Sequence, residues 1–378
     1  MNKKEITEIK KQLSQENCTI TSICGCYVDG EKNKKAVFRE AFLALPQEEM
    51  LKYFEIFKKA LTGTLGKNLL NMEFPSASEQ SGGTQEMLLQ LRDSELKDDG
   101  LLDNFYDRVI EGYQTVDNYL ILLIYSAYDV PGQGSDSLAM EDASEEVYKN
   151  VLCCICPVHL SKPGLSYYSD ENCFKERVRD WVLDKPMLGF LFPAFNERST
   201  DLHSTLYYVA NPEELRFDFA DAVLGCELPM TAGGQKEIFQ QIIEETLGED
   251  CNFESVKEIH EQLNEYVEEK KDEPEPVAIG KKEVINLLAA SGVDNDKIEH
   301  LESHFEETAG ENASLLASNI VNNRKFEIKT PDVVVQVKPD RTELVETKMI
   351  DGRPCLVIAL SDSVAVNGIP VRMPMEDS

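Results

Sequence analysis

The stretch that decides the fold is Tyr119-Leu-Ile-Leu-Leu-Ile-Tyr-Ser-Ala-Tyr128, the most apolar run in the chain. It ends at Asp129, whereas a helix needs about 20 apolar residues to span a bilayer. The run therefore predicts a buried strand and no membrane segment. Residues 147–158 and 187–195 are continuously apolar over a similar length. Because the strand-like segments follow one another in the chain, we expect antiparallel pairing.

Turn signals and helical periodicity surround these predicted strands. Residues 18–28 and 36–45 flank the turn-rich stretch 29–33, and this order predicts a hairpin. After Pro46, apolar side chains recur every three or four residues, which predicts a helix that stops at Gly63. The N-terminal part therefore has an α+β pattern with a mostly antiparallel sheet.

The chain changes character in its second half. From Pro212 to Val267 the apolar side chains follow a helical period. Residues 271–277 are charged and interrupted by proline, so they cannot bury a face and predict a solvated linker. We therefore predict two domains, an α+β body at residues 1–270 and a smaller α+β module at residues 278–378.

The predicted module has short helices followed by a β-meander. Apolar positions around Val284 and Leu301 indicate two short amphipathic helices. Three strands are then predicted, at residues 326–338, 343–350 and 355–360. Asp351-Gly352 is a strong hairpin turn signal between the last two of them.

Composition limits the possible partners. The chain has 38 Lys and Arg residues against 69 Asp and Glu residues, a formal net charge of −31. Such an excess of acid repels phosphate backbones, which disfavours a general nucleic-acid binder. The apolar fraction of 42% is that of an ordinary globular protein and excludes disorder throughout.

Five of the ten cysteines form two groups that resemble metal ligands. They are Cys24 and Cys26, and Cys153, Cys154 and Cys156, with His159 nearby in sequence. No apolar signal segment follows the charged N-terminus, so we expect a cytoplasmic protein with reduced thiols. Strand residues two apart are separated by roughly twice the 3.3 Å rise, too far for two sulfurs of one zinc ion. We predict buried core thiols and no metal or other cofactor; whether the two groups meet in space stays open.

A second pattern, Asp332 with Glu346 and Lys348, resembles the ligands and lysine of metal-dependent nucleases. If the two strands pair around a turn at residues 339–342, Asp332 points to the opposite face from the other two side chains. A register shift of one residue would reverse this conclusion. We interpret the three as surface charges and keep the nuclease-like site as an alternative.

The loop at residues 195–201 concentrates polar groups between two apolar runs. Arg198 could pair with a carboxylate or phosphate, with Asn196 and Asp201 beside it. The same loop could equally be a hairpin turn in which Asn196 or Asp201 bonds its own backbone. We favour the turn, but these three residues are the best candidates for a binding surface.

His300 and His304 lie one helical turn apart. Their order does not match the His-Glu-x-x-His pattern, and no third ligand is evident. We expect both side chains to flank the apolar face of a helix in solvent.

Five unusual strings extend over nearly the whole chain. They are ITSICGCYV at residues 20–28, LRDSELK at 91–97, LCCICPVH at 152–159, FPAFNERST at 192–200 and TPDVVV at 330–335. Together they resemble an uncharacterised bacterial family, catalogued as a domain of unknown function and common in anaerobic Gram-positive bacteria. The resemblance implies a bacterial cytoplasmic protein and brings no assigned activity or catalytic residues.

Three functional hypotheses follow. The leading one is a non-enzymatic interaction or regulatory protein with a protein partner, since no dinucleotide, Walker or nucleophile-elbow motif occurs. The second is an enzyme whose site is assembled from distant residues. The third is an acidic protein that imitates nucleic acid and occupies a basic partner.

Overall fold

The computed structural model describes the chain except for residues 134–138, 272, 311–313, 323–324, 361–363 and 372–378. The side chains of residues 133–145, 295, 299–300, 302–304 and 307 also lie outside the description, and the predicted positions of the His300 and His304 side chains are among them. Contacts divide the chain into two compact units, Met1–Ala232 and Gly233–Ser378.

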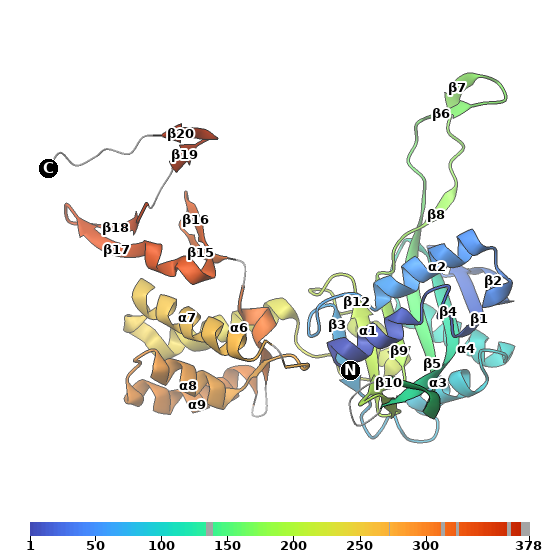
Figure 1. The fold of residues 1–378 in the computed structure, drawn as a ribbon, viewed down its shortest axis with the longest axis horizontal. Coiled ribbons are helices and arrows are strands. Elements are labelled where there is room, and N and C mark those ends of the chain that lie inside the picture. Colours follow the sequence, from blue (N-terminus) through green and yellow to red (C-terminus); the bar gives the residue numbers. More distant parts are fainter. Residues whose placement is uncertain (134–138, 272, 311–313, 323–324, 361–363, 372–378) are drawn as a thin grey trace. The chain divides into compact units, whose positions relative to one another are not determined.

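An eight-stranded antiparallel sheet forms the centre of the first unit (Figure 1). Its order is β2 (Lys34–Ala41), β1 (Ile20–Val28), β4 (Asn118–Gln133), β5 (Ala139–Leu160), β9 (Leu188–Phe192), β12 (Ser204–Val209) and β3 (Leu69–Glu73), with β8 (Trp181–Leu183) pairing with β5 off this path. The three apolar runs predicted as strands are β4, β5 and β9, which are neighbours in the sheet. The predicted hairpin of β1 and β2 is also confirmed.

Helices cover both faces of this sheet, which explains why its central strands are apolar throughout. On β4, Leu123 belongs to one core and Leu122 to the other. One core lies beneath α3 (Thr84–Asp93) and α4 (Asp99–Gly112), and the other beneath α1 (Lys3–Lys11) and α2 (Gln47–Ala60). Continuous apolar runs are usual in parallel sheets; here double coverage imposes the same pattern on antiparallel strands.

The helices begin where local chemistry satisfies their free N–H groups. Asn2 caps α1 in a capping box with Glu5, and the Asp98 carboxylate accepts the N–H of Leu101 at the start of α4. Helix α2 begins after Pro46 as predicted, and it buries Phe54, Phe57 and Ala60 at helical spacing.

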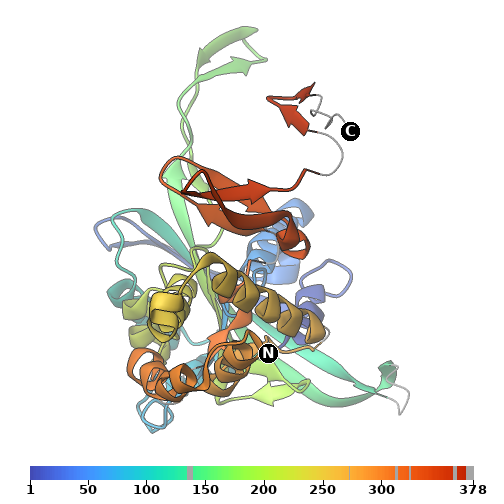
Figure 2. The same ribbon diagram turned by 90° about the vertical axis from the view of Figure 1, so that its left-hand side faces the viewer.

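A two-stranded ribbon projects from the sheet of the first unit (Figure 2). It consists of β6 (Leu165–Tyr168) and β7 (Cys173–Glu176), and it continues from the end of β5 and returns through β8. A smaller hairpin, β10 (Ala194–Asn196) and β11 (Ser199–Asp201), lies elsewhere in the unit. The short elements η1 (Phe42–Ala44), α5 (Phe217–Phe219) and η2 (Ala220–Leu224) complete it.

The second unit is built on four helices around an apolar core. They are α6 (Ala232–Leu247), α7 (Phe253–Glu269), α8 (Lys281–Ala290) and α9 (Asn295–Ala309). The helices before and after residues 271–277 share this core, so the division by contacts lies near Ala232 and not at the predicted linker. The domain bounds 1–270 and 278–378 are a prediction from the sequence, and the shared core favours a unit that begins near residue 233 over independent folding of residues 278–378.

Three separate hairpins follow, with the short elements η3 (Gly248–Asp250), β13 (Ala278–Ile279), β14 (Leu315–Leu316), α10 (Ala317–Ile320) and η4 (Pro339–Leu344) in the same unit. The hairpins are β15 (Phe326–Lys329) with β16 (Val334–Val337), β17 (Val345–Ile350) with β18 (Arg353–Ile358), and β19 (Val364–Val366) with β20 (Ile369–Val371). The single strand predicted over residues 326–338 is therefore wrong. Thr330 and Val333 close a turn within it, since the Thr330 N–H donates to the Val333 carbonyl at 2.9 Å.

Other predictions for this unit are confirmed. Asp351 and Gly352 have φ angles of 50° and 74° and form the hairpin turn between β17 and β18.

The fold class of the whole chain is α+β with a large antiparallel sheet, as predicted. Within the described part of the chain, no helix is long and apolar enough to cross a membrane.

Candidate anion-binding site

The cysteine groups do not converge. Cys24, Cys26 and Cys153 lie in the core on one face of the sheet, and Cys154 and Cys156 lie in the core on the other. Even on the shared face, β4 separates the groups, because Leu123 pairs with Cys24 on one side and with Cys153 on the other. Two strand spacings are about 9.6 Å, much more than the separation of sulfurs that share a metal ion.

Burial also keeps these thiols protonated. It raises the pKa of Cys24 to about 12 and that of Cys26 to about 11. The pKa of Cys153 and that of Cys154 are raised well above the ordinary value by the same cause. Because the thiolate is the nucleophile and the metal ligand, these side chains act as small core residues. Across the described residues, no three His, Cys, Asp or Glu side chains are grouped to hold a metal ion.

The loop at residues 195–201 forms a hairpin turn. Asn196 pairs with Ser199, and the two residues between them, Glu197 and Arg198, have positive φ angles of 51° and 59°. These angles are those of a two-residue type I′ turn, which usually takes Asn or Gly. Helix α1 holds the turn in this conformation, because the Glu5 carboxylate accepts the Glu197 N–H at 2.8 Å.

The polar side chains of this turn have partners within the first unit. The Arg198 guanidinium donates to both Glu8 carboxylate oxygens, at 2.8 and 3.1 Å, and to the Pro131 carbonyl at 3.1 Å. The Asn196 amide donates to Asp201 at 2.6 Å. These bonds give the three residues a structural role, and a ligand for them stays a prediction.

The nuclease-like residues lie on two different hairpins. Asp332 is in the turn between β15 and β16, whereas Glu346 and Lys348 are on β17. The predicted pairing around a turn at residues 339–342 is wrong, because β17 pairs with β18 and that stretch belongs to η4. Lys348 instead forms an ion pair with Glu346 at 2.5 Å on the exposed surface of β17.

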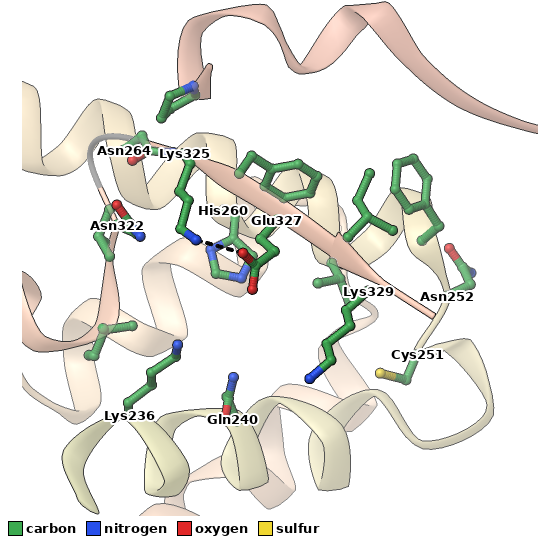
Figure 3. Close-up of a pocket in the computed structure, with 17 residues that line it drawn as sticks. Lys236, Gln240, Cys251, Asn252, His260, Asn264, Asn322, Lys325, Glu327 and Lys329 are labelled. Carbon is green, nitrogen blue, oxygen red and sulfur yellow. Dashed lines mark hydrogen bonds and ion pairs between the residues drawn. The ribbon is translucent and has the colours of Figure 1, made fainter. Parts of the chain in front are cut away.

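A pocket of about 740 Å³ opens in the second unit between α6, α7 and β15 (Figure 3). Its polar lining consists mostly of ammonium and amide groups. The polar and ionisable residues are Lys236, Gln240, Cys251, Asn252, His260, Asn264, Asn322, Lys325, Glu327 and Lys329. Three lysines and one glutamate leave two net positive charges with His260 neutral, in a chain with a net charge of −31.

Strand β15 supplies the charged side of the pocket. Lys325, Glu327 and Lys329 alternate with apolar residues, so they share one side of the chain. Figure 3 shows these three side chains on the pocket side of the strand, opposite Lys236 and Gln240 of α6. The strand is anchored on α7 by Phe326, whose ring centroid lies 6.0 Å from that of His260 and 6.4 Å from that of Phe253.

Two of the lysines keep their charge available. Lys325 forms an ion pair with Glu327 at 2.6 Å, which lowers the pKa of that carboxyl group. Considering only described residues, Lys236 and Lys329 form no ion pair. Their ammonium groups and the neighbouring amides are donors that suit the oxygen atoms of a phosphate, sulfate or carboxylate group.

His260 lies half-buried in the pocket wall. Burial lowers its pKa, and the nearby positive charge of Lys236 lowers it further. The ring is therefore uncharged at neutral pH and offers one donor and one acceptor. An anion beside it would favour the protonated form.

Sequence reasoning missed this pocket entirely. Its lysines come from segments that are far apart in the chain, and Asn, Gln and Lys in helices are usually solvated. One local signal exists, the alternation of charged and apolar residues over Lys325-Phe-Glu-Ile-Lys329, which indicates a strand with one charged face.

A comparison with known protein families gives a match over nearly the whole chain, as the five unusual strings do. The family model described as "Domain of unknown function (DUF4317)" matches residues 1–369. The chain belongs to this family. The DUF4317 match covers the sheet unit and nearly all of the helical unit, so the pocket lies within the family region. The comparisons with curated proteins and with solved structures gave no match.

Proposed function

We propose that this protein is a non-enzymatic regulatory protein of the bacterial cytoplasm, and that its second unit binds a small anionic ligand. The observation that carries the proposal is the convergence of Lys236, Lys325 and Lys329 with four amide side chains around one pocket. In this proposal, ligand binding controls contact with a protein partner. The pocket volume falls in the range of sites for small molecules.

The net charge of the whole chain does not prevent such binding. At physiological ionic strength, charges separated by more than about 8 Å are largely screened. The charges that line the pocket therefore dominate the interaction with a small ligand inside it. A nucleic acid, in contrast, would extend over the acidic surface and be repelled.

The chemistry of the pocket supports binding rather than catalysis. Ammonium and amide N–H groups donate hydrogen bonds to oxygen atoms, and neither group is a nucleophile in this form. A general base usually has a partner that orients it, and among the residues that the structure describes, His260 has a ring contact with Phe326 and no carboxylate bonded to it. The pocket therefore has the donors of a binding site without the arrangement of a general base.

Calorimetric titration of the full chain with sulfate and inorganic pyrophosphate tests the proposal. We expect saturable binding that weakens as sodium chloride is raised. Lys236→Gln and Lys329→Gln should each reduce the affinity by about tenfold, as expected for a lost charge-assisted hydrogen bond.

Lys282→Gln is the matched control, because Lys282 is an exposed residue of α8 outside the pocket. It should leave the affinity unchanged. Absence of binding for both anions, or equal losses in all three variants, would contradict the proposed function.

A further inference from the structure

The anion-binding pocket of the second unit contains one carboxylate among its donors. Glu327 lies between Lys325 and Lys329 on β15, and its side chain faces the pocket (Figure 3). The ion pair with Lys325 lowers the pKa of Glu327, so the carboxylate is ionised at neutral pH. Because like charges repel, a ligand that is only a negatively charged oxyanion gains nothing from this part of the pocket.

Two hydrogen bonds hold this carboxylate by the same oxygen atom. The Lys325 ammonium group donates to Glu327 Oε2 at 2.6 Å, and the Gln336 amide of β16 donates to it at 2.7 Å. Among the described residues, no group donates to Oε1. Figure 3 shows this second oxygen on the side that faces Lys236 and Gln240. The protein therefore orients the carboxylate and leaves one acceptor available to a ligand in the pocket.

Ammonium groups lie on both sides of this acceptor. Lys329 follows Glu327 by two residues on the same face of β15, a separation of roughly twice the 3.3 Å rise of a strand. Lys236 lies across the pocket on α6 (Figure 3). In the part of the chain that the structure describes, neither of these two lysines has an ion-pair partner. The pocket thus places an acceptor for a neutral donor beside two donors for an anion.

A hydroxyl group is a neutral donor that suits such an acceptor, and acidic side chains bind ribose hydroxyl groups in this way in dinucleotide-binding proteins. In a sugar phosphate, the hydroxyl groups and the phosphate are only a few bonds apart. We propose that the pocket binds a phosphate ester of a sugar, with the phosphate at Lys236 and Lys329 and a hydroxyl group at Glu327. This inference rests on the proposed anion binding and names its ligand class, with Glu327 as the residue that determines specificity.

Two kinds of ligand share this chemistry, a free sugar phosphate and the sugar phosphate part of a nucleotide. Apolar side chains also line the pocket, among them Phe253, Val256 and Ile320. A nucleobase that packs on them adds affinity by removing apolar surface from water, whereas a free sugar phosphate leaves them uncovered. Adenosine monophosphate and ribose 5-phosphate therefore distinguish the two sources.

Calorimetric titration of the full chain with ribose 5-phosphate and butyl phosphate tests the proposal. Both are phosphate monoesters, but butyl phosphate has no hydroxyl group. We expect ribose 5-phosphate to bind about tenfold more tightly, as expected for one hydrogen bond to a charged group. Adenosine monophosphate that binds more tightly still assigns the site to a nucleotide. An affinity no higher than that of ribose 5-phosphate assigns it to a free sugar phosphate.

Glu327→Gln should reduce the preference for ribose 5-phosphate to about twofold, because the hydrogen bond loses its charged acceptor. The affinity for butyl phosphate should rise, because a negative charge leaves the pocket. A purely structural role of Glu327 would instead weaken both ligands together.

Glu343→Gln is the matched control. Glu343 is an exposed residue of η4, and its carboxylate pairs with Arg341 at 2.6 Å, as that of Glu327 pairs with Lys325. It lies outside the pocket, so this variant should leave both affinities unchanged.

Two results would overturn the proposal. The first is ribose 5-phosphate that binds no more tightly than butyl phosphate. The second is a preference for ribose 5-phosphate that Glu327→Gln reduces no more than Glu343→Gln does. If sulfate and pyrophosphate still bind and Lys236→Gln weakens them, only the ligand class is wrong. If no anion binds, the proposed function fails as well.

Discussion

The two units place their chemically notable side chains in opposite surroundings. The five cysteines of the sheet are covered on both faces by helices, and burial raises their pKa values. Lys236 and Lys329 of the helical unit face a pocket that a ligand can enter. The cysteines look more reactive in the sequence, yet they are buried and protonated, whereas the two lysines lie where a ligand can reach them. Residue type therefore indicates a site only together with the layer in which the fold places it.

The two units divide near Ala232. Truncation tests this division, and we expect it to change cooperative unfolding more than any single substitution does. Residues 278–378 lack Phe239, Ile242 and Leu263, which share the apolar core with Leu288 and Phe305. We expect residues 233–378 to unfold cooperatively by circular dichroism and residues 278–378 to show no cooperative transition. A cooperative transition of residues 278–378 would instead support a boundary at 271–277.

Alkylation of the native protein tests the burial of the sheet thiols. Cys251 is exposed, whereas Cys24, Cys26, Cys153 and Cys154 are buried. With iodoacetamide at neutral pH, the buried thiols should react at least about a hundredfold more slowly than Cys251, because they must open and ionise first. Mass spectrometry of peptides measures each rate. Equal rates for Cys251 and the sheet thiols in the native protein would contradict the burial of the sheet thiols. As a control, denaturant should make the rates equal.

Arg198 differs from the pocket lysines because its guanidinium group is bound by Glu8 within the same unit. Arg198→Met removes the paired bonds to Glu8, and we expect a loss of about 1–3 kcal/mol in the free energy of unfolding of the first unit. Urea denaturation measures this loss. Glu8→Gln in the same background should add little, because both changes remove one interaction. Full additivity would show that the pair does not stabilise the turn.

The smallest expected effect concerns the pH dependence of the helical unit. The pKa of His260 is lowered in the folded protein from its ordinary value of 6.5. As the pH falls below 6.5, His260 is therefore protonated in the unfolded chain before it is protonated in the folded chain. The contribution of His260 to stability is present above pH 6.5 and is lost as the pH falls through the folded pKa.

An anion in the pocket stabilises the protonated ring, so sulfate affinity should rise by a few-fold between about pH 7.5 and 5.5. Sulfate keeps its charge over this interval, which isolates the protein groups. His260→Gln should flatten the dependence. An unchanged slope in this variant would remove His260 from the site.

Much of the fold follows from local patterns. The strands β4, β5 and β9 and the turn at Asp351-Gly352 were predictable because uninterrupted apolar runs and a Gly turn signal act over a few residues. The strand predicted over residues 326–338 failed because its valines obscured the turn between Thr330 and Val333. A Pro-Asp pair within a β-rich run is itself a turn signal.

The candidate site depended on information that is not local. Alternation places Cys153 and Cys154 on opposite faces, but only the strand order shows that β4 separates Cys24 from Cys153. In the same way, the alternation of Lys325 and Lys329 indicates a charged face. Only the packing of β15 on α7 brings that face toward Lys236.

The double coverage of β4 and β5 also bears on how members of this family can diverge. A strand with one wet face can acquire a new polar group there at little cost, whereas a strand covered on both sides has no such position. New polar side chains are therefore expected at the edges of the sheet and in the helical unit. Among relatives, we expect the central strands to drift only between hydrophobic residues of similar volume, while ligand preference evolves in the segments around them.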